Sequence, residues 1–81
     1  MHMIYDSPSY CVVEFRDPEG LVGGFEIMDK TSRREVFLGG ALARRFREDV
    51  DALVSTEPTI DEIDAFLAGF GPFMVQPMSV H

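Results

Sequence analysis

The sequence has little that would hold a small fold together covalently. It contains one cysteine, Cys11, and no tryptophan in 81 residues. A single cysteine cannot form an intrachain disulfide, and no cluster of cysteine and histidine offers a metal site. A chain of this length buries only about 60 to 65% of the surface of its unfolded form, and such domains commonly need a disulfide, a metal or a partner subunit. We therefore expect a homodimer.

Long apolar runs are also absent. No stretch approaches the ~20 residues that span a bilayer. Residues 1–10 contain neither a basic leader nor the apolar core of a signal peptide. An unpaired cysteine in a segment of strand character suits a reducing compartment. These observations predict a cytoplasmic protein that does not associate with membranes.

Basic residues are scarce, with 7 against 14 acids and a net charge of −7. This balance argues against nucleic acid as a partner, because sequence-independent binding depends on neutralising phosphates. Residues 30–47 nevertheless hold six of the seven basic residues and a single acid, Glu35. Five arginines of this basic block form the candidate surface for a partner or an anion: Arg33, Arg34, Arg44, Arg45 and Arg47.

The hydrophobic pattern predicts a single α+β domain over residues 1–81. We expect an antiparallel meander of three to four strands covered by two helices, in the order β-β-β-β-α-α. Residues 1–9 predict a short edge strand and a turn, residues 10–38 the antiparallel strands, and residues 72–81 an extended tail.

Alternation along Tyr10 to Arg16 predicts a strand whose buried face carries Cys11, Val13 and Phe15. The opposite face is only half polar, so we expect a further element to cover its apolar members, Tyr10 and Val12.

The most specific local pattern is a hairpin closed by residues 30–33. A four-residue turn there places Asp29 opposite Arg34, and the apolar residues then pair on one face. The expected apolar pairs are Ile27 with Val36 and Phe25 with Leu38.

Two amphipathic helices are predicted over residues 40–55 and 59–69. Gly39-Gly40 breaks the preceding strand, and Thr59 with Glu62 matches a capping box. Apolar residues recur at spacings of three and four in both helices. The predicted buried residues are Leu42, Ala43, Phe46, Val50, Leu53 and Val54 in the first helix and Ile60, Ile63, Phe66, Leu67 and Phe70 in the second.

No pattern indicates a catalytic, cofactor or metal site, so we expect neither an enzyme nor a bound cofactor. The acids Asp61, Glu62 and Asp64 suit the first turns of a helix, where the dipole favours carboxylates. Cys11 alternates with apolar residues, which is typical of an inert core thiol. Gly39-Gly40 matches no phosphate loop, although an anion site is an alternative there because a helix with arginines in its first turns follows.

Five segments are more specific than composition: YDSPSYCVVEF, GGFEIMDK, REVFL, ARRFRE and PTIDEIDAFL. They resemble a family of small bacterial proteins known only as a domain of unknown function. The resemblance implies a cytoplasmic bacterial protein of this size, and it brings no activity, cofactor or catalytic residue.

Two functions are consistent with these observations. The first is a non-enzymatic, homodimeric interaction or regulatory module, whose basic block meets the acids of a symmetry mate or of an unidentified protein partner. The alternative is an RNA- or nucleotide-binding module that uses the arginine-rich hairpin end and the first helix. We favour the first, and we expect Arg44→Glu with Arg45→Glu to weaken self-association or partner binding without unfolding the chain.

Overall fold

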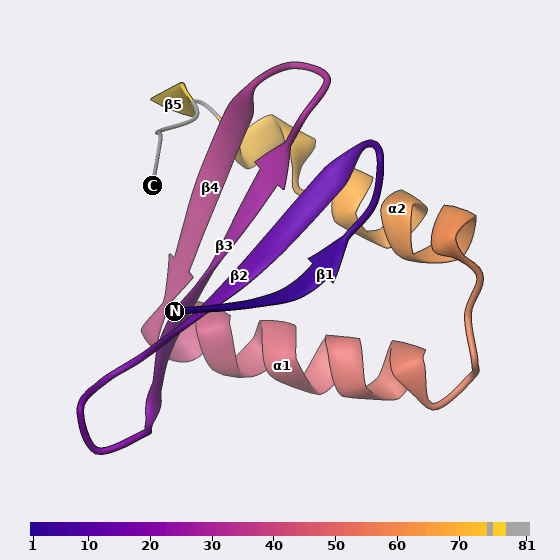
Figure 1. Cartoon of the computed structure of the whole chain (residues 1–81). Coiled ribbons are helices and arrows are strands. Elements are labelled where there is room, and N and C mark those ends of the chain that lie inside the picture. Colours follow the sequence, from indigo (N-terminus) through magenta and orange to yellow (C-terminus); the bar gives the residue numbers. More distant parts are fainter. Residues whose placement is uncertain (75, 78–81) are drawn as a thin grey trace.

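The computed structural model describes residues 1–74 and the backbone of residues 76–77. Four antiparallel strands are followed by two helices (Figure 1), which confirms the predicted α+β class and element order. The elements are β1 (His2–Asp6), β2 (Tyr10–Arg16), β3 (Val22–Asp29), β4 (Arg34–Gly39), α1 (Gly40–Val54) and α2 (Ile60–Ala68).

The sheet is a simple meander in which each strand pairs with the next along the chain. The register of the hairpin formed by β3 and β4 agrees with the prediction, since Asp29 pairs with Arg34, Ile27 with Val36 and Phe25 with Leu38. Turn geometry and hydrophobic pattern specify the same alignment, and a shift of one residue would turn every apolar side chain to the other face.

The segment expected to be an extended tail, residues 72–81, begins with a short 3₁₀ turn, η1 (Gly71–Phe73). The backbone of β5 (Gln76–Pro77) then pairs antiparallel with the start of β4. The other residues of the expected tail, 75 and 78–81, lie outside the described residues.

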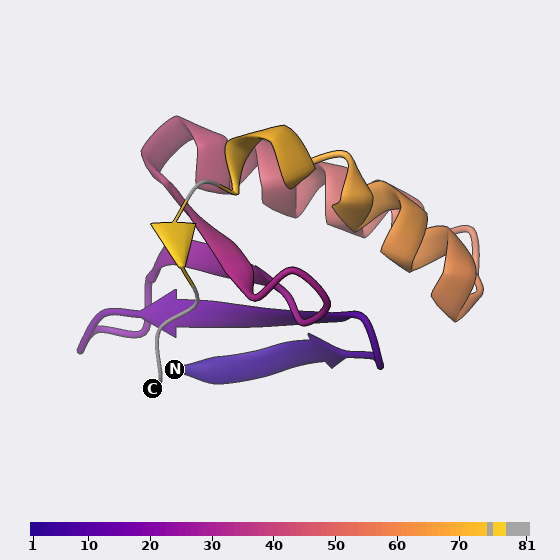
Figure 2. The same cartoon turned by 90° about the horizontal axis from the view of Figure 1, so that it is seen from above.

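Both helices lie on one side of the sheet (Figure 2), so the molecule has two layers. The main core lies between these layers, and Phe25, Ile27 and Leu67 are its most buried large side chains. The ring of Phe46 on α1 lies at its centre, 5.0 Å from Phe25 and 5.6 Å from Phe70 between ring centroids.

The helices cover the face of β2 that carries Tyr10 and Val12. The prediction that a further element covers these residues is therefore confirmed. Cys11 and Val13 are buried as expected, but they form a second, smaller cluster with Met28 on the opposite face. The sequence pattern indicated two apolar faces, and it could not say which one the helices would choose.

The helix predictions hold except at the helix ends. Gly40 begins α1 with a φ of +56°, a left-handed conformation that favours glycine, and Thr59 and Glu62 form the predicted capping box of α2. Leu42, Val54 and Ile60 were expected to be buried, but they are exposed. They belong to the first or last turn of a helix, where less of the other layer lies opposite them.

Candidate functional site

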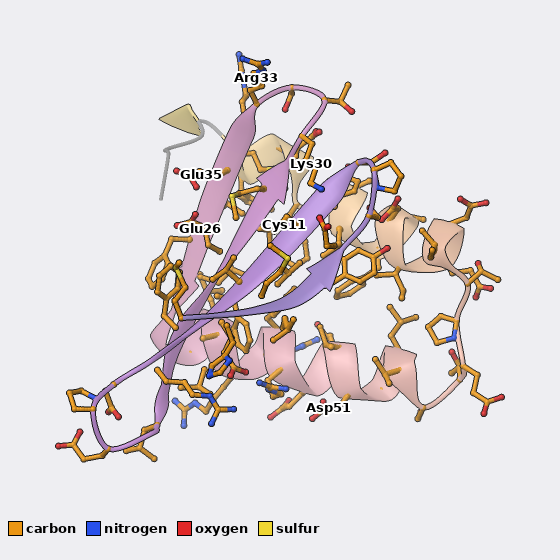
Figure 3. All side chains as sticks on the ribbon, viewed as in Figure 1. Cys11, Glu26, Lys30, Arg33, Glu35 and Asp51 are labelled. Carbon is orange, nitrogen blue, oxygen red and sulfur yellow. The ribbon has the colours of Figure 1, made fainter. Side chains whose placement is uncertain are left out.

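The five arginines of the candidate surface fall into two groups. Arg33 and Arg34 lie at the hairpin end that joins β3 to β4, where Figure 3 labels Arg33. Arg44, Arg45 and Arg47 lie on α1, which begins beyond the opposite end of β4. Because β4 has six residues, the strand alone separates the groups by about 20 Å. The basic block of the sequence is therefore two surfaces in the fold.

Lys30, in the same turn as Arg33, binds the hairpin end to the neighbouring turn. Lys30 forms an ion pair with Asp6, and its Nζ donates a hydrogen bond to the carbonyl oxygen of Ser7 at 2.8 Å. Arg33 has a φ of +58° in the turn, and its side chain and that of Arg34 are exposed. The lysine thus joins the hairpin to the turn between β1 and β2, and the two arginines face solvent.

On α1, two of the three arginines form an ion pair with an acid four residues further along the helix. Arg45 Nε lies 3.4 Å from Asp49 Oδ1, and Arg47 Nη1 lies 3.9 Å from Asp51 Oδ1. Arg44 forms no ion pair with any residue in the described part of the chain. Among the three arginines of α1, Arg44 is therefore the one whose charge is not offset by an acid in the described part of the chain.

Glu14 on β2 belongs to this region although the sequence pattern did not single it out, and its residue surface is only 2% exposed beneath α1. Its carboxylate accepts a hydrogen bond from Arg16 Nε at 2.6 Å and another from Arg47 on α1. Burial alone would raise the pKa of Glu14, but the hydrogen bonds and charges of the two arginines outweigh it, so the pKa is lowered. The sequence signal that could have identified Glu14 is an acid within a mainly apolar strand.

A cavity of about 400 Å³ opens beside the start of α1. It lies between that end of the helix and β3, and two guanidinium groups contribute to its wall. The lining residues are Val22, Gly23, Phe25, Gly40, Ala43, Arg44 and Arg47. A second, smaller cavity of about 90 Å³ lies between the two helices and the first two strands, and its lining is apolar apart from Tyr5.

The face of the sheet opposite the helices, called here the helix-free face, is defined by the strand register. One row across four strands consists of Met3, Val13, Glu26 and Phe37. The next row consists of Asp6, Cys11, Met28 and Glu35. Figure 3 shows Glu26, Glu35 and Cys11 on neighbouring strands. The two ends of the first row are exposed, Met3 by 63% and Phe37 by 55%, whereas Val13 and Glu26 between them are buried.

A third row of the helix-free face consists of Phe15, Gly24 and Gly39. The ring of Phe37 lies over Gly24, where an added Cβ would approach the ring too closely. It also contacts Phe15 edge to face, with 5.9 Å between ring centroids. The two glycines thus form the floor beneath an aromatic pair, which explains why this end of the sheet needs residues without side chains.

The acids at the start of α2 have structural roles, as the sequence indicated. Glu62 completes the capping box. Asp64 Oδ1 accepts hydrogen bonds from Tyr5 Oη at 2.8 Å and from Ser7 Oγ at 2.9 Å, which joins α2 to the turn after β1. Burial and the bond to Asp64 raise the pKa of Tyr5.

Cys11 has the features of an inert thiol. It is buried on the helix-free face, and this burial, reinforced by the charge of Asp6, raises its pKa. A raised pKa reduces the thiolate form, which is the nucleophile and the metal ligand. Among residues 1–74, no group of three or more His, Cys, Asp or Glu side chains is arranged to hold a metal ion. Within the same part of the chain, neither helix has the length and apolar character needed to cross a membrane.

Comparison with known proteins identifies a family whose function is not known. Residues 1–81 match the family described as "Protein of unknown function (DUF3567)". The chain is 51% identical over 85 aligned positions to Protein BTH_I0359 of Burkholderia thailandensis, and the alignment covers all of both chains. No solved structure matches the chain.

Proposed function

The chain belongs to the DUF3567 family of proteins of unknown function, and we propose that it is a non-enzymatic interaction module that forms a homodimer through the helix-free face of its sheet. The observation that carries this proposal is the pair of exposed apolar side chains, Met3 and Phe37, at the two ends of one row of that face. The proposal includes the cytoplasmic location expected from the sequence.

The chemistry of the helix-free face suits a second copy of the same chain. Its centre is the cluster of Cys11, Val13 and Met28, with Phe15 packed against it. These side chains are already buried within one chain, so the exposed Met3 and Phe37 at the ends of the row are what a second copy would contact first. A face-to-face contact related by a two-fold axis would place the same apolar centre on both sides, and sheets pack in this way about 10 Å apart.

The size of the face limits the area that the two copies can bury. Four strands spaced about 4.8 Å apart, and three rows of side chains about 7 Å apart, give a face of at most roughly 400 Å² per copy, and the accessible part is smaller because Cys11, Val13 and Met28 are already buried. Both copies together would bury at most about 800 Å², which is below the range of stable complexes and typical of weak, transient ones. We therefore propose a concentration-dependent dimer.

The arginines are not the self-association surface in this proposal, because both groups lie away from the rows of the helix-free face. The alternative of an RNA-binding module over the whole basic block receives no support from an arrangement that separates its arginines by about 20 Å. Both arginine groups therefore stay accessible to a further partner or ligand in the proposed dimer.

The test is the mass of the protein in solution, measured by sedimentation over a wide concentration range at low and at high salt. We expect a dimer that dissociates on dilution and responds little to salt, because apolar contacts are not screened as charges are. Met3→Glu should shift the equilibrium to monomer, since it adds a charge to the contact of each copy. The matched control is Leu42→Glu, which places the same charge at an exposed apolar position on the helix layer.

A monomer at every concentration would contradict the proposed dimer. A dimer that dissociates at high salt and tolerates Met3→Glu would contradict the proposed interface and favour the arginine groups. Equal effects of Met3→Glu and Leu42→Glu would also count against the helix-free face.

A further inference from the structure

The cavity beside the start of α1 combines apolar walls with two guanidinium groups, and we infer that it binds a small phosphate monoester with an apolar portion. The cavity lies on the helix side of the sheet, so this inference does not depend on the proposed dimer. Four observations support it: the size of the cavity, the position of Arg47, the charge balance of the lining and the way α1 begins.

The size of the cavity fits a small molecule. Its volume of about 400 Å³ lies within the usual range of ~300 to 1,000 Å³ for ligand sites. Val22, Phe25 and Ala43 give it apolar walls, and Arg44 and Arg47 give it charge. Such a combination suits a compact ligand with one anionic and one apolar end better than it suits a polymer.

Arg47 is held in place before any ligand arrives. Its guanidinium group bonds the buried carboxylate of Glu14, and its Cζ lies 5.1 Å from the centroid of the Phe25 ring. Both contacts come from the sheet, so they restrain the side chain relative to the cavity wall. A restrained donor loses less conformational entropy on binding, which favours affinity.

The charge balance around the cavity is positive although the chain as a whole is acidic. None of the seven lining residues is an acid. Glu14, behind the wall, and Asp51, 3.9 Å from Arg47 on α1, carry two negative charges against the two positive charges of Arg16 and Arg47. Arg44 adds a charge that no ion pair offsets in the described part of the chain. The site therefore presents a net positive charge to a ligand.

The start of α1 adds to the preference of the cavity for an anion, although the inference does not depend on it. Gly39, the N-cap residue, provides no side chain to cap the first amides, and the first turn contains no acid. Guanidinium groups and helix-start amides together favour phosphate, which accepts several hydrogen bonds at once.

The experiment is a titration of the full chain with phenyl phosphate and, separately, with inorganic phosphate. Binding is measured by calorimetry and by the shifts of amide NMR signals. We expect phenyl phosphate to bind more tightly than inorganic phosphate, because only phenyl phosphate occupies the apolar walls. The largest shifts should fall at residues 40–44.

The decisive comparison uses two neighbouring arginines of the same helix. Arg44→Gln removes a charge from the cavity, and it should weaken phenyl phosphate binding by about tenfold, the order expected for a lost hydrogen bond to a charged group. Arg45→Gln removes the same charge from a position that does not line the cavity, and binding should change by less than about twofold, as surface charges do. Both arginines are exposed, so both variants should fold, and circular dichroism checks this.

Three outcomes would overturn the inference: no binding of either probe at millimolar concentration, equal binding of the two probes, or equal weakening by the two variants. RNA that binds while phenyl phosphate does not would also overturn it and would point to an extended surface. The sedimentation experiment on Met3→Glu is read separately, so failure of the dimer and failure of this site are distinguishable.

Discussion

The carboxylate of Glu14 on β2 forms an ion pair with the guanidinium group of Arg47 on α1, across 33 positions of the sequence. This contact joins the middle of α1 to the sheet. The carboxylate is nearly inaccessible, whereas the Arg47 side chain is 40% exposed. The acid is thus the partner that depends on the pair, because a buried carboxylate without its cations would be costly.

We predict that Glu14→Gln destabilises the protein by about 1 to 2 kcal/mol at neutral pH. This is the scale of a charged hydrogen bond, reduced because solvent screens the exposed arginines. The folded pKa of Glu14 lies below its ordinary value of 4.5, so the folded state binds a proton less readily than the unfolded state. The stabilisation should therefore be complete above about pH 5 and be lost as the pH falls through the folded pKa.

Urea denaturation of the wild type and of Glu14→Gln between pH 3 and pH 8 measures this difference. A difference in unfolding free energy that stays constant down to about pH 3 would show that the carboxylate charge is not the cause.

The close approach of Phe37 to Gly24 gives a second prediction. A methyl group at Gly24 would lie 2.7 Å from the carbonyl oxygen of Leu38 and against the Phe37 ring. Since a backbone atom cannot move aside as a flexible side chain does, Gly24→Ala should cost about 2 kcal/mol of unfolding free energy. Gly23→Ala is the control, because its nearest neighbour would be the Phe15 carbonyl oxygen at 3.9 Å. Similar melting temperatures for the two variants would refute the close approach.

The bonds of Asp64 give a third prediction. Asp64→Ala removes the acceptor of both the Tyr5 and the Ser7 hydroxyl groups, and it should reduce the unfolding free energy by about 1 to 2 kcal/mol. Asp61→Ala, on the same helix but exposed in its first turn, should cost only a few tenths to ~1 kcal/mol through the helix dipole. Thermal denaturation of the two variants compares them directly. If Asp61→Ala is the more damaging change, the link between α2 and the first turn is not a main source of stability.

Much of the local structure could be predicted from the sequence. The register of the β3–β4 hairpin followed from the four-residue turn at 30–33 and from pairing of Ile27 with Val36, because both depend on neighbours within the hairpin. The capping box of Thr59 and Glu62 was equally predictable, since its hydrogen bonds join residues three positions apart. The grouping of the arginines was not predictable, because adjacency along the chain says nothing about which end of a strand faces which end of a helix.

By itself, then, the sequence determined the meander, the two helices and the capping box of α2, because each of these depends mainly on interactions within a few residues. Only the tertiary structure decided which face of β2 the helices cover, and with it the burial of Glu14 beneath Arg47 and the cavity beside Arg44. β2 carries apolar side chains on both faces, so either face satisfies the hydrophobic pattern. The choice between them arises from long-range packing of Phe46, Phe66 and Phe70 against Phe25 and Val12, which no local pattern contains.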